Sequence, residues 1–200
     1  MERDDPDVRL MLAFRSGDDS ALAELYGRWA GPLLRYLERM VKERATAEEL
    51  LQESFIRVHQ ARERYEPTAK FSTWLYRIAR NLALNELDRS RNKRPHLSAE
   101  NSDRDDDRRP PLVLVGNSPS ADELVDARRT EELIEKVLAE LPERQRSALW
   151  LAVVEGHSYA EIADALETTT GSVKSLVHRA RAAVADRLAE AATPPVEAQA

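Results

Sequence analysis

The sequence contains no cysteine in its 200 residues. A disulfide framework, a thiolate zinc site and a cysteine nucleophile are therefore all excluded. No apolar run approaches the roughly 18 residues that a membrane-spanning helix needs. The first residues, MERDDPDVRL, lack the basic, apolar and small-residue order of a signal peptide. We therefore expect a cytoplasmic protein with no membrane insertion.

Aromatic residues are also scarce, at 6% of the chain, whereas 42% of the residues are hydrophobic and 33% are charged. This balance is typical of soluble helical proteins and provides enough apolar residues for a core. From about residue 19 to residue 91, apolar side chains recur with a helical period, for example at Leu22, Leu25, Tyr26 and Trp29. No run alternates like a strand. The predicted fold class is therefore all-α.

A polar stretch separates two helical segments. Residues 95–120 are rich in Pro, Asn, Ser and Asp and are predicted to form a flexible acidic linker. Helical periodicity resumes near residue 122, and the final residues, TPPVEAQA, are predicted to be a frayed tail. We therefore predict two small helical domains, at residues 1–94 and 121–192, followed by a tail at residues 193–200.

The net charge of −6 conceals segments of opposite sign. Residues 57–94 contain ten Lys or Arg and four Asp or Glu. Residues 168–188 contain four Lys or Arg and one Asp. Residues 131–167 are acidic, with three basic and nine acidic side chains. Such banding can reflect solvated helix faces. Two basic islands in an acidic protein can also mark two separate contacts with a polyanion.

The second predicted domain carries a helix-turn-helix pattern. Ser158 and Glu161 have the spacing of a capping box before a short helix, and a second helix follows the turn ETTTG. One side of that second helix is apolar, with Val173, Leu176, Val177, Ala180 and Val184. The other side is polar and basic, with Gly171, Lys174, Ser175, His178 and Arg181. Such a helix fits the major groove of DNA, where Lys and Arg read guanine edges and grip phosphates. The alternative is a helical hairpin with a solvated basic face.

Aromatic and basic residues interleave at the end of the first domain. Tyr65, Phe71 and Trp74 lie close to Lys70 and Arg77, a combination that single-stranded nucleic acid needs for stacking and phosphate neutralisation. Phe71 is more simply explained as a core residue, and Trp74 can serve both purposes.

An acidic helix is predicted just upstream. Thr46 and Glu49 have the spacing of another capping box, and Glu49, Gln52 and Glu53 face outward from the apolar side of the helix. An acidic helix face in a nucleic-acid-binding protein suggests a protein partner.

In this order, the segments AEELLQESFIRVHQ, FSTWLYRIARNL, LPERQRSALWLAVVEGHSYAEIADAL and GSVKSLVHRARAAV resemble the extracytoplasmic-function (ECF) group of the sigma-70 family of bacterial RNA polymerase sigma factors. The resemblance spans residues 21–188. It implies a transcription initiation factor with a region 2-like first domain and a region 4-like second domain. Such a factor binds core RNA polymerase, reads the minus-35 promoter element as duplex DNA and opens the minus-10 element.

The resemblance also implies roles for individual residues and partners. The core polymerase-binding residues would be Glu49, Gln52, Glu53 and Arg57. The minus-10 DNA-binding residues would be Tyr65, Trp74, Arg77, Arg80, Asn81 and Asn85. The minus-35 DNA-binding residues would be Gly171, Ser172, Lys174, Ser175, His178, Arg179 and Arg181. The partners would be core RNA polymerase, through its beta-prime clamp helices and beta flap, promoter DNA at the nucleoid, and an anti-sigma factor.

Two positions depart from the family pattern. Asp88 makes its surroundings less favourable for phosphate, because many members carry basic residues there. Leu176 stands where arginine is frequent, and we interpret it as extra packing at the edge of the apolar face.

Other classes of protein explain less of the sequence. A helix-turn-helix regulator that acts without polymerase would account for the second domain alone, and a purely structural adaptor would not require two basic islands. An enzyme acting on nucleic acid is disfavoured, because the four histidines lack ligand spacing and no acidic pair stands out as a metal site. We therefore expect no catalytic residue, no metal and no cofactor.

Overall fold

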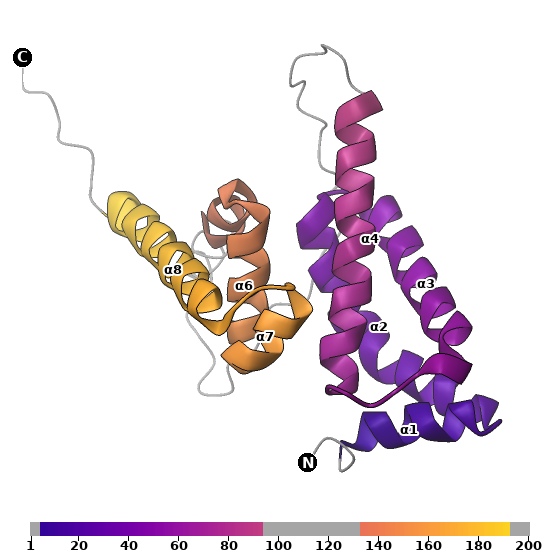
Figure 1. Cartoon of the computed structure of the whole chain (residues 1–200). Helices are drawn as coiled ribbons and strands as arrows, with labels where there is room; N and C mark the ends of the chain where they lie inside the picture. Colours follow the sequence, from indigo (N-terminus) through magenta and orange to yellow (C-terminus); the bar gives the residue numbers. More distant parts are fainter. Residues whose placement is uncertain (1–4, 94–132, 193–200) are drawn as a thin grey trace, which may run out of the picture.

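The protein forms two helical units that lie side by side (Figure 1). The computed structural model describes residues 5–93 and 133–192, so the predicted linker and tail lie outside the described residues. Within those two ranges every regular element is a helix. The predicted all-α fold with two small helical domains is confirmed.

The first unit is a bundle of three long helices with a shorter one across its end (Figure 1). Its elements are α1 (Pro6–Arg15), α2 (Asp19–Val41), α3 (Arg44–Gln60), the 3-10 turn η2 (Arg62–Arg64) and α4 (Phe71–Lys93). Leu25, Leu33 and Leu37 of α2 are fully buried, as are Leu75 and Ala79 of α4. Burial of one leucine side chain contributes about 1.5–3 kcal/mol, so this core accounts for much of the stability of the unit.

The helix α1 was not predicted from the sequence. Asp5 caps it, Pro6 stands at its first position, where a missing N–H costs nothing, and Val8 is buried against the bundle. Asp7 ties α1 to α2, because its carboxylate accepts from the Trp29 indole at 3.0 Å and pairs with the Arg28 guanidinium at 2.7 Å. Asp5, Pro6 and the buried Val8, Met11 and Phe14 are local signals from which this helix could have been predicted.

The predicted capping box at Thr46 and Glu49 is wrong. The helix α3 already begins at Arg44, and the Thr46 hydroxyl donates to the Glu43 carboxylate instead. One residue of the predicted apolar stripe in α2 also differs, since Tyr26 is 44% exposed and touches Phe55 only at the edge of the bundle.

The second unit contains the predicted helix-turn-helix. Its described elements are a helical segment at residues 133–140, α6 (Glu143–Val153), α7 (Tyr159–Ala165) and α8 (Thr170–Ala192). The capping box of Ser158 and Glu161 is present with both of its hydrogen bonds. In the turn before α8, Glu167 adopts a left-handed φ of 51°.

The predicted apolar side of α8 faces the core of this unit. Val173, Val177 and Ala180 are at most 1% exposed, and Leu176 is 8% exposed. The interpretation of Leu176 as a packing residue is therefore confirmed. Val184, one turn further on, is half-buried.

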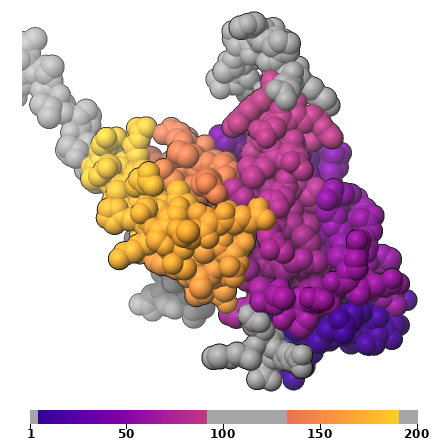
Figure 2. Space-filling view, in the orientation of Figure 1, coloured from indigo at the N-terminus to yellow at the C-terminus, as the bar shows by residue number. Residues whose placement is uncertain are grey.

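The two units are in direct contact. The helix α7 packs against α4, and α6 contacts α2. Figure 2 shows the orange and yellow surface of the second unit pressed against the magenta surface of α4. This contact determines which predicted site residues are accessible.

Candidate nucleic-acid interface

The predicted core-binding residues lie together on α3. Glu49, Gln52 and Arg57 are exposed, and the half-buried Glu53 accepts from Arg57 Nε at 3.0 Å. We call these four residues the docking face. In Figure 1, α3 lies on the side of the first unit away from the second. The docking face is therefore not covered by the second unit.

An exposed isoleucine extends the docking face. Ile56 is 49% exposed and follows Glu49, Gln52 and Glu53 at the i+7, i+4 and i+3 positions of the same helix. The sequence analysis missed it. Its spacing from Glu49, Gln52 and Glu53 could have identified it in the sequence, because that spacing places Ile56 on the same side of the helix.

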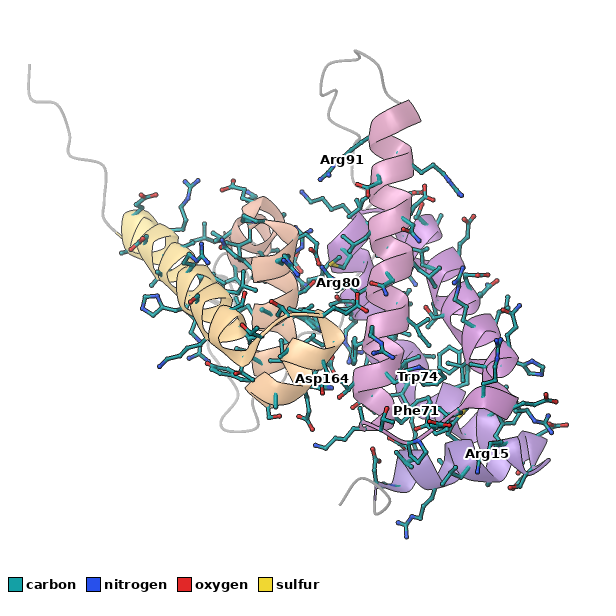
Figure 3. All side chains as sticks on the ribbon, in the orientation of Figure 1. Arg15, Phe71, Trp74, Arg80, Arg91 and Asp164 are labelled. Carbon is teal, nitrogen blue, oxygen red and sulfur yellow. The ribbon has the colours of Figure 1, made fainter. Side chains whose placement is uncertain are left out.

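The predicted minus-10 residues lie on α4 and on the loop before it, and we call them the minus-10 face. Tyr65 is only 4% exposed, and its ring centroid lies 4.9 Å from that of the half-buried Trp74. Arg15 Nη1 donates to the Tyr65 carbonyl oxygen at 2.9 Å and so anchors the loop. Phe71 is fully buried, which confirms it as a core residue. Figure 3 shows Phe71 and Trp74 at the lower end of α4, near Arg15.

The rest of the minus-10 face divides into exposed and buried positions. Arg77, Asn81 and Asn85 are exposed and follow one another at four-residue steps along α4, so they form a row. Arg80 is only 5% exposed, and its guanidinium makes two hydrogen bonds to the Glu143 carboxylate, at 2.9 and 3.1 Å. The structure therefore separates Arg80 from the exposed row.

A cleft of about 380 Å³ lies between the minus-10 face and the second unit. On one side it is lined by Tyr65, Trp74 and Arg77, and on the other side by Asp164 and Glu167. Figure 3 shows Asp164 on α7 across from Trp74 on α4. The wall from the first unit is aromatic and carries one base and one acid, Arg77 and Glu66, whereas the wall from the second unit is acidic.

The predicted minus-35 residues lie along α8, and we call them the recognition face. All of them are exposed except Ser172, which is half-buried. The Ser175 hydroxyl donates to the Gly171 carbonyl oxygen at 3.2 Å, and Arg179 Nε donates to the Ser175 carbonyl oxygen at 3.3 Å. In Figure 1, α6 and α7 lie between α8 and the first unit. The recognition face is therefore open.

The second unit presents acidic residues to the first unit. These residues were not predicted as site residues. Glu161 Oε1 pairs with Lys70 Nζ at 2.6 Å, and burial alone would raise its pKa. The hydrogen bonds from Lys70 and from Ser158 outweigh this burial and lower the pKa of Glu161 to about 2. The signal that could have found these residues is the opposite sign of the bands at 57–94 and 131–167.

Neither a metal site nor a membrane span is found in the described part of the chain. There, no three His, Asp or Glu side chains are grouped so that they could hold a metal ion. None of the helices at residues 5–93 and 133–192 is long and apolar enough to cross a bilayer.

Two family models match the chain in the order of its two units. The Sigma-70 region 2 model matches residues 25–93, and the Sigma-70, region 4 model matches residues 131–184. The fold and these matches define a sigma-type transcription factor. The chain is also 30% identical over 176 residues to the ECF RNA polymerase sigma factor SigW of Bacillus subtilis (strain 168), covering 87% of this chain and 92% of that protein. The chain therefore belongs to the ECF group of the sigma-70 family.

Membership of this family makes the chain a transcription initiation factor that directs RNA polymerase to promoters. The match of the first unit to region 2 favours this function over a helix-turn-helix regulator that acts without polymerase.

Two solved structures share the fold. One is CnrH in complex with the cytosolic domain of CnrY, with a TM-score of 0.65 and 21% identity over 94% of this chain and 99% of that chain. The other is the sigma factor RpoE in complex with the anti-sigma factor NepR from Bartonella quintana, with a TM-score of 0.64 and 20% identity over 84% of this chain and 96% of that chain.

Proposed function

We propose that the two domains divide promoter recognition between them. The second domain, residues 121–192, reads the minus-35 element, and the first domain, residues 1–94, binds core polymerase and opens the minus-10 element. The observation that carries this proposal is the recognition face, a basic helix surface that is exposed along α8 while the opposite side packs in the core. Such a helix can enter the major groove of duplex DNA without unfolding any part of its domain.

The chemistry of the recognition face suits base edges and phosphates. Lys174 and Arg181 supply cationic donors, and Ser175 and His178 supply further hydrogen-bonding groups between them. Lys and Arg pair with guanine acceptors, and serine can contact several bases. Arg179, at the edge of this row, is suited to grip a phosphate.

The minus-10 face opens DNA by binding, not by catalysis. Trp74 and Tyr65 offer aromatic surface beside the cleft, and Arg77, Asn81 and Asn85 offer donors along the same helix. Unstacking one base costs a few kcal/mol, which stacking on an aromatic ring and phosphate neutralisation offset. No bond is made or broken, so the protein needs no catalytic residue and no cofactor.

Core polymerase binds the docking face on α3. Glu49 and Gln52 are free of the second unit and present a polar, largely acidic surface, and Ile56 adds an apolar contact at its end. Acidic side chains around an apolar contact suit a partner surface with basic residues, such as the beta-prime clamp helices. The second domain makes a further contact with the beta flap.

An anti-sigma factor is a further partner. The support is the fold shared with RpoE, which is bound to the anti-sigma factor NepR. The protein acts in the cytoplasm and joins the nucleoid when it is active.

Run-off transcription tests the proposed function. The purified chain is added to bacterial core polymerase with a library of promoter fragments from its own genome, and the transcripts are sequenced. Discrete start sites that share two upstream motifs are the expected result. No transcription, together with tight binding of the isolated chain to duplex DNA, would instead support the helix-turn-helix regulator.

A further inference from the structure

The loop between η2 and α4 forms part of the cleft beside the minus-10 face. We call residues 65–70 the minus-10 loop. Its first residue, Tyr65, packs against Trp74, and its exposed Glu66 and Thr68 line the cleft with them. A base that leaves the duplex is bound by the rings and polar groups that surround it. The conformation of the minus-10 loop therefore determines whether these groups converge on one base.

Both ends of the minus-10 loop are held by α1. Figure 1 shows the loop passing over α1 on its way into α4. At one end, Arg15 Nη1 donates to the Tyr65 carbonyl oxygen at 2.9 Å. At the other end, the Phe71 N–H donates to Asp5 Oδ2 at 3.3 Å. Asp5 and Arg15 stand at opposite ends of α1, so this one helix spans the whole loop.

The helix α1 is itself fixed to the bundle by other residues. Val8, Met11 and Phe14 are at most 1% exposed, and the Arg62 guanidinium of η2 lies over the Phe14 ring, with Cζ 4.8 Å from the ring centroid. Burial of this apolar side explains the position of α1. It does not explain why the polar side chains at the two ends of the helix bond to the backbone at the two ends of the minus-10 loop.

The contacts of α1 restrict the minus-10 loop strongly. Both use a charged side chain on a main-chain group, and hydrogen bonds with one ionised partner are stronger than neutral ones. Between the two held ends lies Pro67, whose ring fixes its φ near −65°. A loop that is already restricted loses less conformational entropy when it orders around a ligand, so it binds more tightly.

We propose that α1 is a positioning element for minus-10 recognition, in which Arg15 and Asp5 hold the two ends of the minus-10 loop in the conformation that receives an unpaired base. The proposal rests on the minus-10 role proposed above. The region 2 match begins at residue 25, so α1 lies outside it. The apparent dissociation constant increases by the inverse of the correctly placed fraction, so a loop that is correctly placed one-fifth of the time binds about fivefold more weakly.

The test removes the Arg15 contact and compares it with a matched change. Arg15→Met deletes the donor to Tyr65 and keeps a long aliphatic side chain. Arg9→Met is the control, because Arg9 is an exposed arginine of the same helix that lies about 120° around the helix axis from Arg15. Both variants lose one positive charge. Arg15→Lys keeps a cationic donor and tests for rescue.

A second variant acts at the other end of the minus-10 loop. Asp5 accepts from the Asp7 N–H through Oδ1 and from the Phe71 N–H through Oδ2. Asp5→Asn leaves a residue that caps α1 equally well, but its amide has one acceptor oxygen for these two N–H groups. This variant therefore weakens the hold on the loop and keeps α1 folded.

The measurement uses holoenzyme reconstituted from core polymerase and each full-length variant. Fluorescence anisotropy gives the dissociation constants of two probes, the single strand that spans the minus-10 element of a promoter mapped by run-off transcription and the same strand with that element replaced. The ratio of the two constants is the sequence preference. Partial unfolding would weaken binding of both probes equally, so the ratio reports the placement of the loop and not the stability of the domain.

We expect Arg15→Met and Asp5→Asn each to reduce the sequence preference at least about fivefold. Arg9→Met should keep the preference of the unsubstituted chain, and Arg15→Lys should restore most of what Arg15→Met loses. Binding of duplex minus-35 DNA should be the same for all variants, because α1 contacts no part of α8 within the described residues.

Three results would overturn the proposal. Equal sequence preference for Arg15→Met, Arg9→Met and the unsubstituted chain would reject the positioning role of α1 and leave the minus-10 role intact. Failure of Arg15→Lys to restore a lost preference would show that the bond to Tyr65 is not the cause. Equal binding of both probes by the unsubstituted holoenzyme would reject the minus-10 role and the proposal with it.

Discussion

At the scale of single residues, side chains that lie close together on α4 have different surroundings. Trp74 is half-buried between the rings of Tyr65 and Phe71, with ring centroids 4.9 and 5.9 Å away, whereas Asn81 two turns further on is exposed. The first side chain therefore has both a packing role and a free edge beside the cleft, and the second has no packing role to lose.

We expect Trp74→Ala and Asn81→Ala to impair promoter opening while leaving duplex minus-35 binding unchanged. Loss of one stacked base costs about 1–3 kcal/mol, so the fraction of open promoter should fall by roughly tenfold for Trp74→Ala. Permanganate footprinting of unpaired thymines measures the fraction of open promoter. Because Asn81 is exposed, its replacement separates a DNA effect from a folding effect, and normal opening by that variant would remove Asn81 from the minus-10 face.

His157 makes the domain contact sensitive to pH. Burial lowers the pKa of His157 below its ordinary value of 6.5. The carboxylates of Glu161 and Glu155 oppose this shift, and the ammonium of Lys70 adds to it, while the ring of Tyr76 packs edge-on at 5.6 Å. Neutral His157 is therefore the form that fits the contact between the two units.

We expect the contact between the two units to be fully stable above pH 6.5 and to weaken as the pH falls below it. A protein whose units have separated then binds a proton at His157 that the packed protein does not, so acid favours separation of the units. Glu161 stays ionised in this range because its pKa is about 2. Fluorescence energy transfer between dyes on Gln60→Cys of α3 and Ala185→Cys of α8, both exposed positions in a chain without cysteine, measures the effect at pH 7.5 and 5.5. His157→Gln should abolish the difference and His178→Gln, on the exposed recognition face, should keep it; the reverse pattern would exclude His157 as the cause.

At the scale of elements, the two sides of α8 have different roles. Its apolar side closes the core of the second unit, and its other side is free for a ligand. Substitutions on the recognition face should therefore change binding without changing the stability of the domain.

We expect Lys174→Ala and Arg181→Ala each to weaken binding to a duplex minus-35 element by about 1–3 kcal/mol for each lost base contact. Fluorescence anisotropy with labelled duplex DNA measures the affinity. Arg187→Ala is the matched control, because this arginine of the same helix pairs with Glu140 at 2.8 Å and lies outside the recognition face. Unchanged affinity of the first two variants would show that α8 does not read this element.

At the scale of the whole molecule, two faces lie clear of the contact between the units, whereas Arg80 of the minus-10 face lies within it. The docking face lies on the far side of the first unit, and the recognition face lies on the far side of the second (Figure 1). Core polymerase and duplex DNA can therefore reach these two faces without any change in the packing of the units.

We expect Glu49→Lys with Glu53→Lys to weaken core polymerase binding at least about tenfold, since reversed charges on a complementary interface repel the partner. Surface plasmon resonance with immobilised core polymerase measures the binding, and Glu63→Lys, an exposed charge reversal on η2, is the control. Equal losses for Glu63→Lys and the docking-face variant would indicate a general charge effect.

The sequence by itself determined the helical fold, the capping box of Ser158 and the buried sides of α3 and α8. It also determined which residues share an exposed helix face, as Lys174 and Arg181 do on α8. These features depend on the spacing of residues along one helix, which periodicity reports directly. Helix α1 was missed although Asp5 and Pro6 are local start signals, and only the tertiary structure showed that Asp7 ties it to Arg28 and Trp29 of α2. Only the tertiary structure decided that Arg80 is buried against Glu143, 63 residues further along the chain. Opposite charges in two distant segments allow many pairings, and the packing of α6 and α7 on the first unit selects one of them.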